Sequence, residues 1–280
     1  MPPPSLLLLI PAYNEESRIA PVLREFATYF RDHYAAPFHL VVVLNGCRDN
    51  TLGVVEEVAR EFPTVRALNF PDPIGKGGAI IEGLRLAAEA HVVTDLVGYV
   101  DADGATSPKT LHELARMVTG DIDCVIGSRW LPGAVLHQSQ TRLRRFVSRC
   151  FHAIVECLFW MHIADTQCPG KVMRRTAVER IHKDLRLSDL SFDVNLLYAL
   201  KRAGFRIKEV PIEWTDKAGS KVTQTLLRSS LVMLLSVVRL RLVHSPFYRM
   251  LLPLRPLEVW IYRKLRAPLT RPASPPRPRL

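Results

Sequence analysis

The stretch LVGYVDADG, residues 96–104, is an apolar run that ends in two aspartates separated by one alanine. If the run is a buried strand, Asp101 and Asp103 lie where the chain leaves the interior. Carboxylates at positions i and i+2 can both reach one cation, and hard oxygen ligands suit Mg²⁺ or Mn²⁺. Gly104 follows them and allows close approach of the backbone to a ligand. Surface loops also produce such pairs, so a metal site needs support from the rest of the chain.

Short apolar runs alternate with helical patterns through the first half of the chain, which is typical of βαβ units around a mainly parallel sheet. Ser107 and Pro108 predict the start of a helix that runs through Val118. The strands that we expect in this half are residues 6–10, 39–44, 65–69, 96–100 and 122–126. The predicted fold class is therefore α/β, with helices flanking the sheet.

The second half of the chain is less regular. We expect a basic amphipathic helix, a helix that ends before Gly204, a strand in RIKEVPIEW and an apolar helix near the C-terminus, at residues 142–162, 192–203, 206–214 and 222–243. The last helix either contacts a membrane in its plane or packs into the core or against a partner. The expected organisation is a catalytic domain (1–221), an amphipathic helical segment (222–265) and a disordered Pro/Arg tail (266–280).

Composition narrows the class of protein. The net charge of +11 points to anionic partners such as nucleic acid, an acidic membrane surface or phosphorylated substrates. The five cysteines are odd in number and lack a CxxC pair, which fits a reduced, cytoplasmic protein better than a disulfide scaffold or zinc site. No uncharged apolar segment reaches the roughly 18 to 20 residues needed to cross a bilayer, and the N-terminal apolar run is interpreted as a strand, not a secretory signal.

Three polar clusters follow the first, second and fourth predicted strands: PAYNEE (11–16), NGCRDNT (45–51) and DADG (101–104). Ligands of open parallel sheets bind at the carboxyl ends of strands, so the three clusters predict one pocket rim, although each alone could be a turn. IGKGGA (74–79) lacks the glycines of a phosphate loop or dinucleotide fingerprint, because Phe70 and Ile80 stand at the required positions. It remains a glycine-rich helix start whose Lys76 suits either phosphate or tight packing.

In their order along the chain, these motifs resemble glycosyltransferase family 2, the inverting nucleotide-sugar enzymes with the GT-A fold. Within that family the chain is most similar to the polyprenyl-phosphate mannosyl- and glucosyltransferases. The resemblance covers about residues 5–225 and rests on IPAYNEE, NGCRDNT, GKGGAIIEGLRLA, DADG, IGSRW, DTQCPGK, FDVNLLYALKRAGFRIKEVPIEW and GSK. Agreement in order over that length is far more specific than any single motif.

The resemblance implies roles for individual residues. Asp101 and Asp103 match the motif that binds the metal and the diphosphate, with Ala102 between them, and Lys76 matches the segment near the base and ribose. Arg129 and Lys221 match basic residues suited to phosphate in the lipid-phosphate branch. The positions that match nucleotide-contacting loops are Pro11, Tyr13, Glu15, Asn45 and Asp49. Asn45 replaces an acidic residue of the family loop, and Pro169-Gly170 replaces the usual residues after DTQC, which puts the base preference and the acceptor side in doubt.

The implied reaction moves a hexose from a nucleotide sugar, UDP-glucose or GDP-mannose, to polyprenyl phosphate at the cytoplasmic face of a membrane. A Mg²⁺ or Mn²⁺ ion on the two aspartates would neutralise the leaving diphosphate. A lipid phosphate is already ionised near neutral pH and needs no strong base, whereas a soluble or polysaccharide hydroxyl acceptor needs a carboxylate base. Asp193 and Asp165 are the candidates for that base, although Asp193 could instead be a helix cap or dipole partner.

The basic charge leaves two further alternatives. Arg142, Arg144, Arg145 and Arg149 crowd an expected helix N-terminus, where either an external anion or a solvated basic face explains them. A basic nucleic-acid-binding protein would show aromatic residues interleaved with the basic patches or a recognisable reader motif. The sequence shows neither, so the expected partners are a nucleotide sugar, polyprenyl phosphate and a membrane surface, without nucleic acid.

Overall fold

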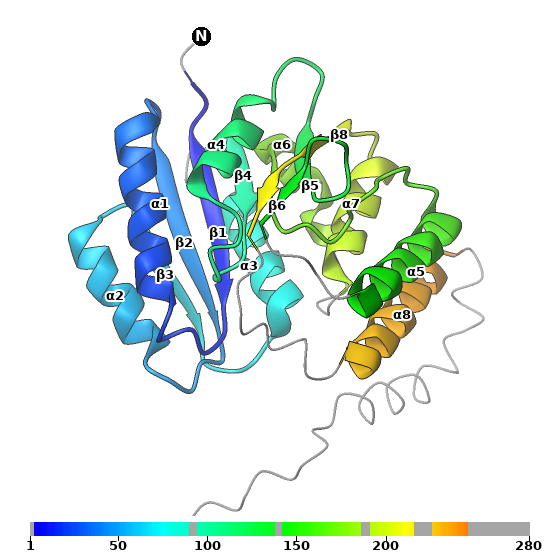
Figure 1. Cartoon of the computed structure of the whole chain (residues 1–280). Helices are drawn as coiled ribbons and strands as arrows, with labels where there is room; N and C mark the ends of the chain where they lie inside the picture. The colour runs from blue at the N-terminus through cyan, green and yellow to red at the C-terminus, as the bar shows by residue number, and fades with distance from the viewer. Residues whose placement is uncertain (1–2, 90–93, 138–141, 186–190, 216–225, 246–280) are drawn as a thin grey trace, which may run out of the picture.

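A computed structural model of the chain describes residues 3–89, 94–137, 142–185, 191–215 and 226–245 (Figure 1). Its strands are β1 (Leu6–Ala12), β2 (Phe38–Asn45), β3 (Val65–Phe70), β4 (Leu96–Tyr99), β5 (Cys124–Ser128), β6 (Val135–Leu136), β7 (Lys171–Arg174), β8 (Ile207–Pro211) and β9 (Glu213–Trp214). Its helices are α1 (Ile19–His33), α2 (Thr51–Glu61), α3 (Gly75–Glu89), α4 (Pro108–Arg116), α5 (Arg142–Phe159), α6 (Arg175–Ile181), the 3₁₀ turn His182–Asp184, α7 (Phe192–Arg202) and α8 (Leu226–Val243).

Seven strands form one sheet in the order β3-β2-β1-β4-β7-β5-β8, and β6 and β9 form a separate two-stranded sheet. Every neighbouring pair in the large sheet is parallel except the two made by β7. The predicted α/β class with a mainly parallel sheet is confirmed. The carboxyl ends of β1 and β2 lie at the lower edge of the sheet in Figure 1.

The inner strand β1, between β2 and β4, is buried on both faces, which explains its uninterrupted run of leucines. Leu6, Leu8 and Ile10 face one core, where α1, α2 and α4 cover the sheet. Leu7 and Leu9 face the other, built from α3, α5, α6, α7 and α8. Because strand side chains alternate between faces, one short run organises both hydrophobic layers.

The helix starts and ends follow the sequence closely. Ser107 Oγ accepts a hydrogen bond from the Thr110 N–H with Pro108 in the first turn, which confirms the predicted cap. That helix ends at Arg116, two residues before the predicted Val118. The basic helix ends at Phe159, three residues before the predicted end. The last helix, α8, is described from Leu226, and residues 222–225, the boundary at 221/222 and the tail 266–280 lie outside the described residues.

Two strand predictions in the second half need correction. RIKEVPIEW is not one strand but two, because β8 pairs with β5 and β9 pairs with β6 in the small sheet. Pro211 has no N–H to continue the ladder, and the chain changes sheets at the next residue. The antiparallel strand β7 is not foreseen from the sequence. It begins with Lys171, a charged residue whose burial depends on a partner distant in the chain.

Candidate functional site

The loops that follow β1 and β2 are joined to each other by hydrogen bonds. The Arg48 N–H donates to Asn14 Oδ1 over 2.8 Å, and the Asn50 N–H donates to Glu16 Oε2 over 3.0 Å. In return, the Glu16 N–H donates to Asp49 Oδ2 over 3.1 Å. The structure therefore brings two of the three predicted polar clusters into one rim at the carboxyl edge of the sheet.

Asp49, a predicted nucleotide contact, organises these loops. Its Oδ1 accepts hydrogen bonds from the Thr51 N–H at 3.2 Å and from Thr51 Oγ1, and Thr51 Oγ1 in turn accepts from the Glu15 N–H at 2.8 Å. Burial raises the pKa of Asp49, but the hydrogen bonds from Thr51 and from the Glu16 backbone outweigh it and lower the pKa below its ordinary value. Asp49 is thus an ionised carboxylate that connects the two loops through hydrogen bonds. Its contact with a nucleotide remains a prediction.

Asn45, the residue that departs from the family pattern, holds the start of α3. Its Oδ1 accepts hydrogen bonds from the N–H groups of Ile74 at 2.6 Å and Gly75 at 2.9 Å. The next residue, Gly46, has φ of 61°, and an added Cβ would lie 2.6 Å from the Pro73 nitrogen, so only glycine fits. An amide oxygen performs this capping without adding charge. The substitution at position 45 therefore keeps β2 and α3 together at the rim.

The two aspartates of DADG lie at the same rim, where a lysine meets them. Lys76 Nζ, in the first turn of α3, is 2.6 Å from Asp101 Oδ1. Burial lowers the pKa of Lys76, but the charges of Asp101 and Asp193 raise it above its ordinary value. This position places Lys76 beside the DADG turn, and its contact with a base and ribose, which the family resemblance implies, remains a prediction.

Asp103, the second aspartate of the DADG turn, is partly buried. Burial and then the nearby charge of Asp101 raise its pKa, although its Oδ1 accepts a hydrogen bond from the Ala105 N–H at 3.0 Å. Gly104 adopts φ of 70°, and a Cβ there would be 3.1 Å from Val22, so the turn favours glycine, while the predicted close approach of a ligand to this backbone remains a prediction. Because the charge of one aspartate raises the pKa of the other, a cation beside the pair would be favourable.

Arg18, which belongs to none of the sequence motifs, supplies positive charge near this pair. It donates from Nη2 to Glu15 Oε1 at 2.8 Å and also from Nε to Oε2. The hydrogen bond with Glu15 raises the pKa of Arg18, and the charges of Asp103 and Asp101 add to that rise. Glu15, a predicted nucleotide contact, is therefore ion-paired within the chain.

Asp193 is held by two residues that sequence reasoning missed. Lys171 Nζ lies 2.6 Å from Asp193 Oδ1, the Tyr99 hydroxyl donates to the same oxygen, and Lys171 also donates to the Cys168 carbonyl. Lys171 and Tyr99 are fully buried. Burial raises the pKa of Asp193, but the charges of Lys171 and Lys76 outweigh it and lower the pKa. The signal in the sequence was a lysine next to the apolar residues of a short strand.

Asp165 is locked in a second buried pair. Arg129 donates to it from Nε at 2.7 Å, from Nη2 at 2.8 Å and from its backbone N–H at 3.0 Å. Burial raises the pKa of Asp165, but the Arg129 hydrogen bonds and charge hold it below its ordinary value. The Asp165 N–H donates to Glu209 Oε1 at 2.7 Å, and the guanidinium carbon of Arg129 lies 5.1 Å from the centre of the Trp214 ring. This unit links β5, β8 and β9.

The remaining predicted residues fall into three groups. Pro11 and Ala102 are buried, so their contribution to a site is the course of the backbone. Tyr13, directly after β1, is exposed, and its contact with a nucleotide remains a prediction. Lys221 lies outside the described residues.

The donor atoms at the rim fit a divalent cation. Asp101 Oδ1 is buried and accepts no hydrogen bond of regular geometry from the part of the chain that the structure describes. Within the same residues, no group of three or more His, Cys, Asp and Glu side chains is assembled around a common centre. Asp101 and Asp103 are thus the residues that would hold Mg²⁺ or Mn²⁺, a cation that typically completes its shell with substrate phosphates and water.

Comparisons with known proteins show the family of the chain. The sequence profile of glycosyltransferase like family 2 matches residues 2–231. The chain is 33% identical over 226 residues to dolichyl-phosphate beta-glucosyltransferase ALG5A of Trichomonas vaginalis, covering 78% of this chain and 68% of that protein. It is 31% identical over 217 residues to glycosyltransferase AglD of Haloferax volcanii, covering 77% of this chain but only 34% of that longer protein.

Solved structures show the same fold. Glucosyl-3-phosphoglycerate synthase of Mycobacterium tuberculosis, crystallised with uridine diphosphate, superposes with a TM-score of 0.62 at 18% identity, covering 85% of this chain and 80% of that one. The predicted GT-A architecture is confirmed at the level of the fold.

Proposed function

Because the chain belongs to glycosyltransferase like family 2, we propose that it transfers glucose from UDP-glucose to a polyprenyl phosphate with inversion at the anomeric carbon. Relatives that carry the name dolichyl-phosphate beta-glucosyltransferase, from Trichomonas vaginalis, Dictyostelium discoideum and Saccharomyces cerevisiae, favour glucose over mannose and a lipid phosphate over a hydroxyl acceptor. We further propose that the reaction uses Mg²⁺ or Mn²⁺ and takes place at the cytoplasmic face of a membrane.

The observation that carries this proposal is that both candidate bases, Asp193 and Asp165, are ion-paired within the chain. Asp193 is paired with Lys171 and Tyr99, and Asp165 is paired with Arg129. A carboxylate that is ion-paired and has a lowered pKa is a poor proton acceptor. A hydroxyl acceptor would need such a base, whereas a lipid phosphate brings an oxygen that is already ionised near neutral pH. Both locked carboxylates therefore suit a phosphate acceptor.

The rim supplies the groups that donor chemistry needs. A cation held by Asp101 and Asp103 would neutralise the negative charge that grows on the leaving diphosphate. Lys76, at the N-terminal turn of α3, adds a second positive charge beside it. Helix N-termini and lysines both favour phosphate oxygens, so the diphosphate is expected to lie between α3 and the DADG turn.

The acceptor phosphate is expected near Arg129. Asp165 receives hydrogen bonds from the Nε and Nη2 atoms of Arg129, so the third nitrogen, Nη1, lies outside that bidentate contact. Burial lowers the pKa of Arg129, but Asp165 raises it well above its ordinary value, so the side chain is cationic at any physiological pH. A rigid, permanently charged guanidinium suits recognition of a phosphate.

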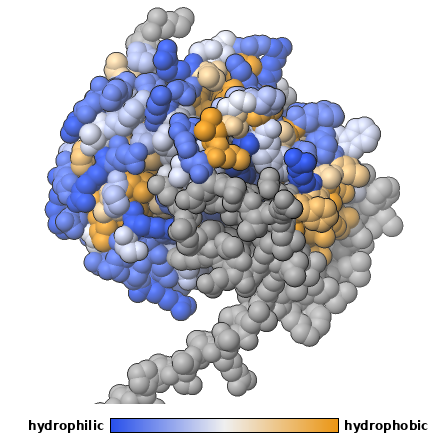
Figure 2. Space-filling model, in the orientation of Figure 1, coloured by the Kyte–Doolittle hydropathy of each residue, from blue (hydrophilic) through white to orange (hydrophobic). Residues whose placement is uncertain are grey.

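Membrane contact is proposed for the face formed by α5 and α8. These helices lie side by side (Figure 1), and apolar side chains gather over that part of the surface in Figure 2. Trp160 and Phe146 are 71% and 67% exposed there, and Val238 and Leu242 of α8 are exposed as well. Tryptophan and arginine are typical of the boundary between lipid and water.

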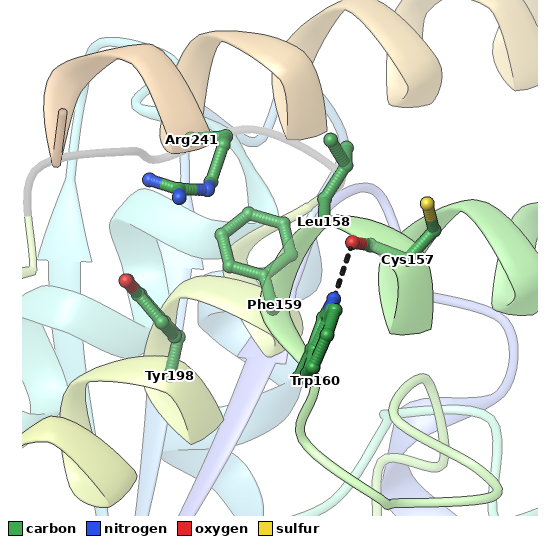
Figure 3. A pocket seen from close by; sticks show the side chains of 6 residues that line it. All are labelled: Cys157, Leu158, Phe159, Trp160, Tyr198 and Arg241. Carbon is green, nitrogen blue, oxygen red and sulfur yellow. Dashed lines mark hydrogen bonds between the residues drawn. The ribbon is translucent and has the colours of Figure 1, made fainter.

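A hollow of about 470 Å³ opens beside Trp160 (Figure 3). Its lining combines apolar and aromatic side chains with one cation, from Cys157, Leu158, Phe159, Trp160, Tyr198 and Arg241. The Trp160 Nε1–H donates to the Cys157 carbonyl at 2.8 Å, which holds the indole in place. Such a lining suits a lipid chain with an anionic head. None of the helices that the structure describes is long and apolar enough to cross a membrane.

The function is tested with radiolabelled donors. UDP-glucose and GDP-mannose are each incubated with the protein and Mn²⁺, with and without polyprenyl phosphate, and label is followed into the lipid extract. We expect product only with UDP-glucose and lipid phosphate together, and loss of product in Asp101→Asn. Product formed without lipid contradicts the acceptor, and product from GDP-mannose contradicts the donor.

Membrane contact is tested by flotation with vesicles that contain anionic lipid at low salt. The wild-type protein is expected to float, and the double variant Phe146→Ser/Trp160→Ser is expected to stay largely at the bottom of the gradient. Met117→Ser is the matched control, because Met117 is an exposed apolar residue at the end of α4, which covers the other face of the sheet. Equal flotation of all three proteins would place the contact elsewhere.

A further inference from the structure

Lys76 occupies a position where a cation is intrinsically disfavoured. It is the second residue of α3, and the partial positive charge of a helix N-terminus repels a cation in the first turn. Asn45 caps the preceding backbone N–H groups, so this end of the helix is fixed. A lysine there is therefore stabilised by an anion, and the anion it meets is Asp101.

The contact between Lys76 and Asp101 is close but open to exchange. Lys76 Nζ is 2.6 Å from Asp101 Oδ1, yet this oxygen accepts no aligned hydrogen bond from the described residues. The two side chains are 41% and 26% exposed. Asp101 Oδ1 itself is buried, but charge without an aligned hydrogen bond holds the pair together and the rest of both side chains keeps contact with solvent, so another charged group can replace either partner.

The charges of Asp193 and Asp101 hold the Lys76 ammonium group beside the DADG turn. Asp193, whose charge also acts on Lys76, is already paired with the fully buried Lys171. From the buried Lys171 outward to the rim, positive and negative groups therefore alternate through Asp193 and Lys76 to Asp101. A divalent cation bound to Asp101 would lie next to Lys76, and the two positive charges would repel each other. An anion that attracts Lys76 away from Asp101 would remove this repulsion.

We propose that Lys76 and the divalent cation compete for the Asp101 carboxylate, and that the diphosphate of the nucleotide relieves this competition by taking Lys76 as its own partner. Cation and nucleotide then bind weakly alone and strongly together, and each strengthens the other by the same factor. This inference rests on the proposed donor and cation, and it is independent of the lipid acceptor.

The test measures binding of Mn²⁺ alone through the electron paramagnetic resonance signal of the free ion, with and without UDP. Buffer that contains UDP but no protein serves as the reference for the Mn²⁺–UDP complex. In Lys76→Met we expect Mn²⁺ alone to bind about tenfold more tightly than in wild type, which corresponds to about 1.4 kcal/mol. The strengthening of Mn²⁺ binding by UDP should fall by a similar factor.

Arg85→Met is the matched control, because Arg85 lies on the same helix in an exposed pair with Glu82 and should bind Mn²⁺ as wild type does. Lys76→Gln repeats the test if the methionine variant unfolds, and circular dichroism checks the fold of each. Unchanged or weaker binding of Mn²⁺ alone in a folded Lys76 variant overturns the competition. If wild-type protein does not bind Mn²⁺ in the presence of UDP, the proposed donor and cation fail instead.

Discussion

The rim of the site and the interior beneath it hold lysine–carboxylate pairs with the same 2.6 Å separation in very different surroundings. Lys76 and Asp101 are partly exposed, whereas Lys171 is fully buried and its partner Asp193 nearly so. Exposed pairs contribute about 0–1 kcal/mol, but removal of one partner from a buried pair costs about 3–5 kcal/mol because the other charge is left uncompensated. The comparison teaches that equal distance does not mean equal role: the inner pair fixes geometry, and the outer pair can exchange partners.

Lys171→Met is expected to have the largest effect on stability. It leaves the Asp193 carboxylate buried beside Tyr99 without its cation, so the free energy of unfolding should fall by about 3–5 kcal/mol. Chemical denaturation measures the change. The double variant Lys171→Met/Asp193→Asn removes both charges and should recover a large part of the loss. If Lys171→Met lowers the free energy of unfolding by less than about 1 kcal/mol, the Lys171–Asp193 pair contributes no more than an exposed surface pair.

Arg129→Met is expected to cost about 3 kcal/mol at neutral pH, at the lower end of the range for buried pairs because Arg129 retains some contact with solvent. The loss should depend on pH. Arg129 lowers the pKa of Asp165, so the pair stabilises the protein above the pKa of the unfolded carboxyl, about 3.9, and this stabilisation disappears as the pH falls through the lower folded value.

Unfolding curves of wild type and Arg129→Met should therefore converge below about pH 4. Arg24→Met is the control, because Arg24 pairs with Glu61 on the exposed surface. A difference between wild type and Arg129→Met that stays constant down to the lowest pH would mean that lost packing against Trp214, not lost charge, explains the destabilisation.

Asn45→Ala is expected to cost about 1 kcal/mol, the typical effect of removing a side-chain cap from a helix N-terminus. Thermal unfolding measures it. Asn45→Asp restores the family residue and keeps an oxygen at the cap, so it should retain stability, with a gain from the helix dipole. If both variants unfold like wild type, the hydrogen bonds to Ile74 and Gly75 do not determine where α3 begins.

Lys76→Met is expected to have the smallest effect on stability, a change below about 1 kcal/mol in either direction. The same denaturation experiment as for Lys171→Met checks it, so the two lysines can be compared directly. A loss as large as that of Lys171→Met would show that the outer pair is structural and would remove the basis for exchange between Asp101 and a diphosphate.

Much of the first half of the chain could be predicted from its sequence, because the signals are local. The apolar runs that form β1 and β2, and the Ser107-Pro108 helix cap, each depend on only a few consecutive residues. The placement of three polar clusters on one rim also followed, since carboxyl ends of parallel strands meet at one edge. The second half depends on contacts between distant residues, and there β7 was missed and the strand at 206–214 was wrong.

For the site, the sequence by itself determined which residue types meet: acidic residues after β4, a lysine at the start of α3 and a family pattern over most of the chain. Only the tertiary structure decided how they pair. Asp193 and Asp165 were candidates for a free base, and the fold places Lys171 and Arg129 against them. The physical reason is that a carboxylate's charge and pKa depend on neighbours that are distant in the chain, and sequence spacing does not reveal those neighbours.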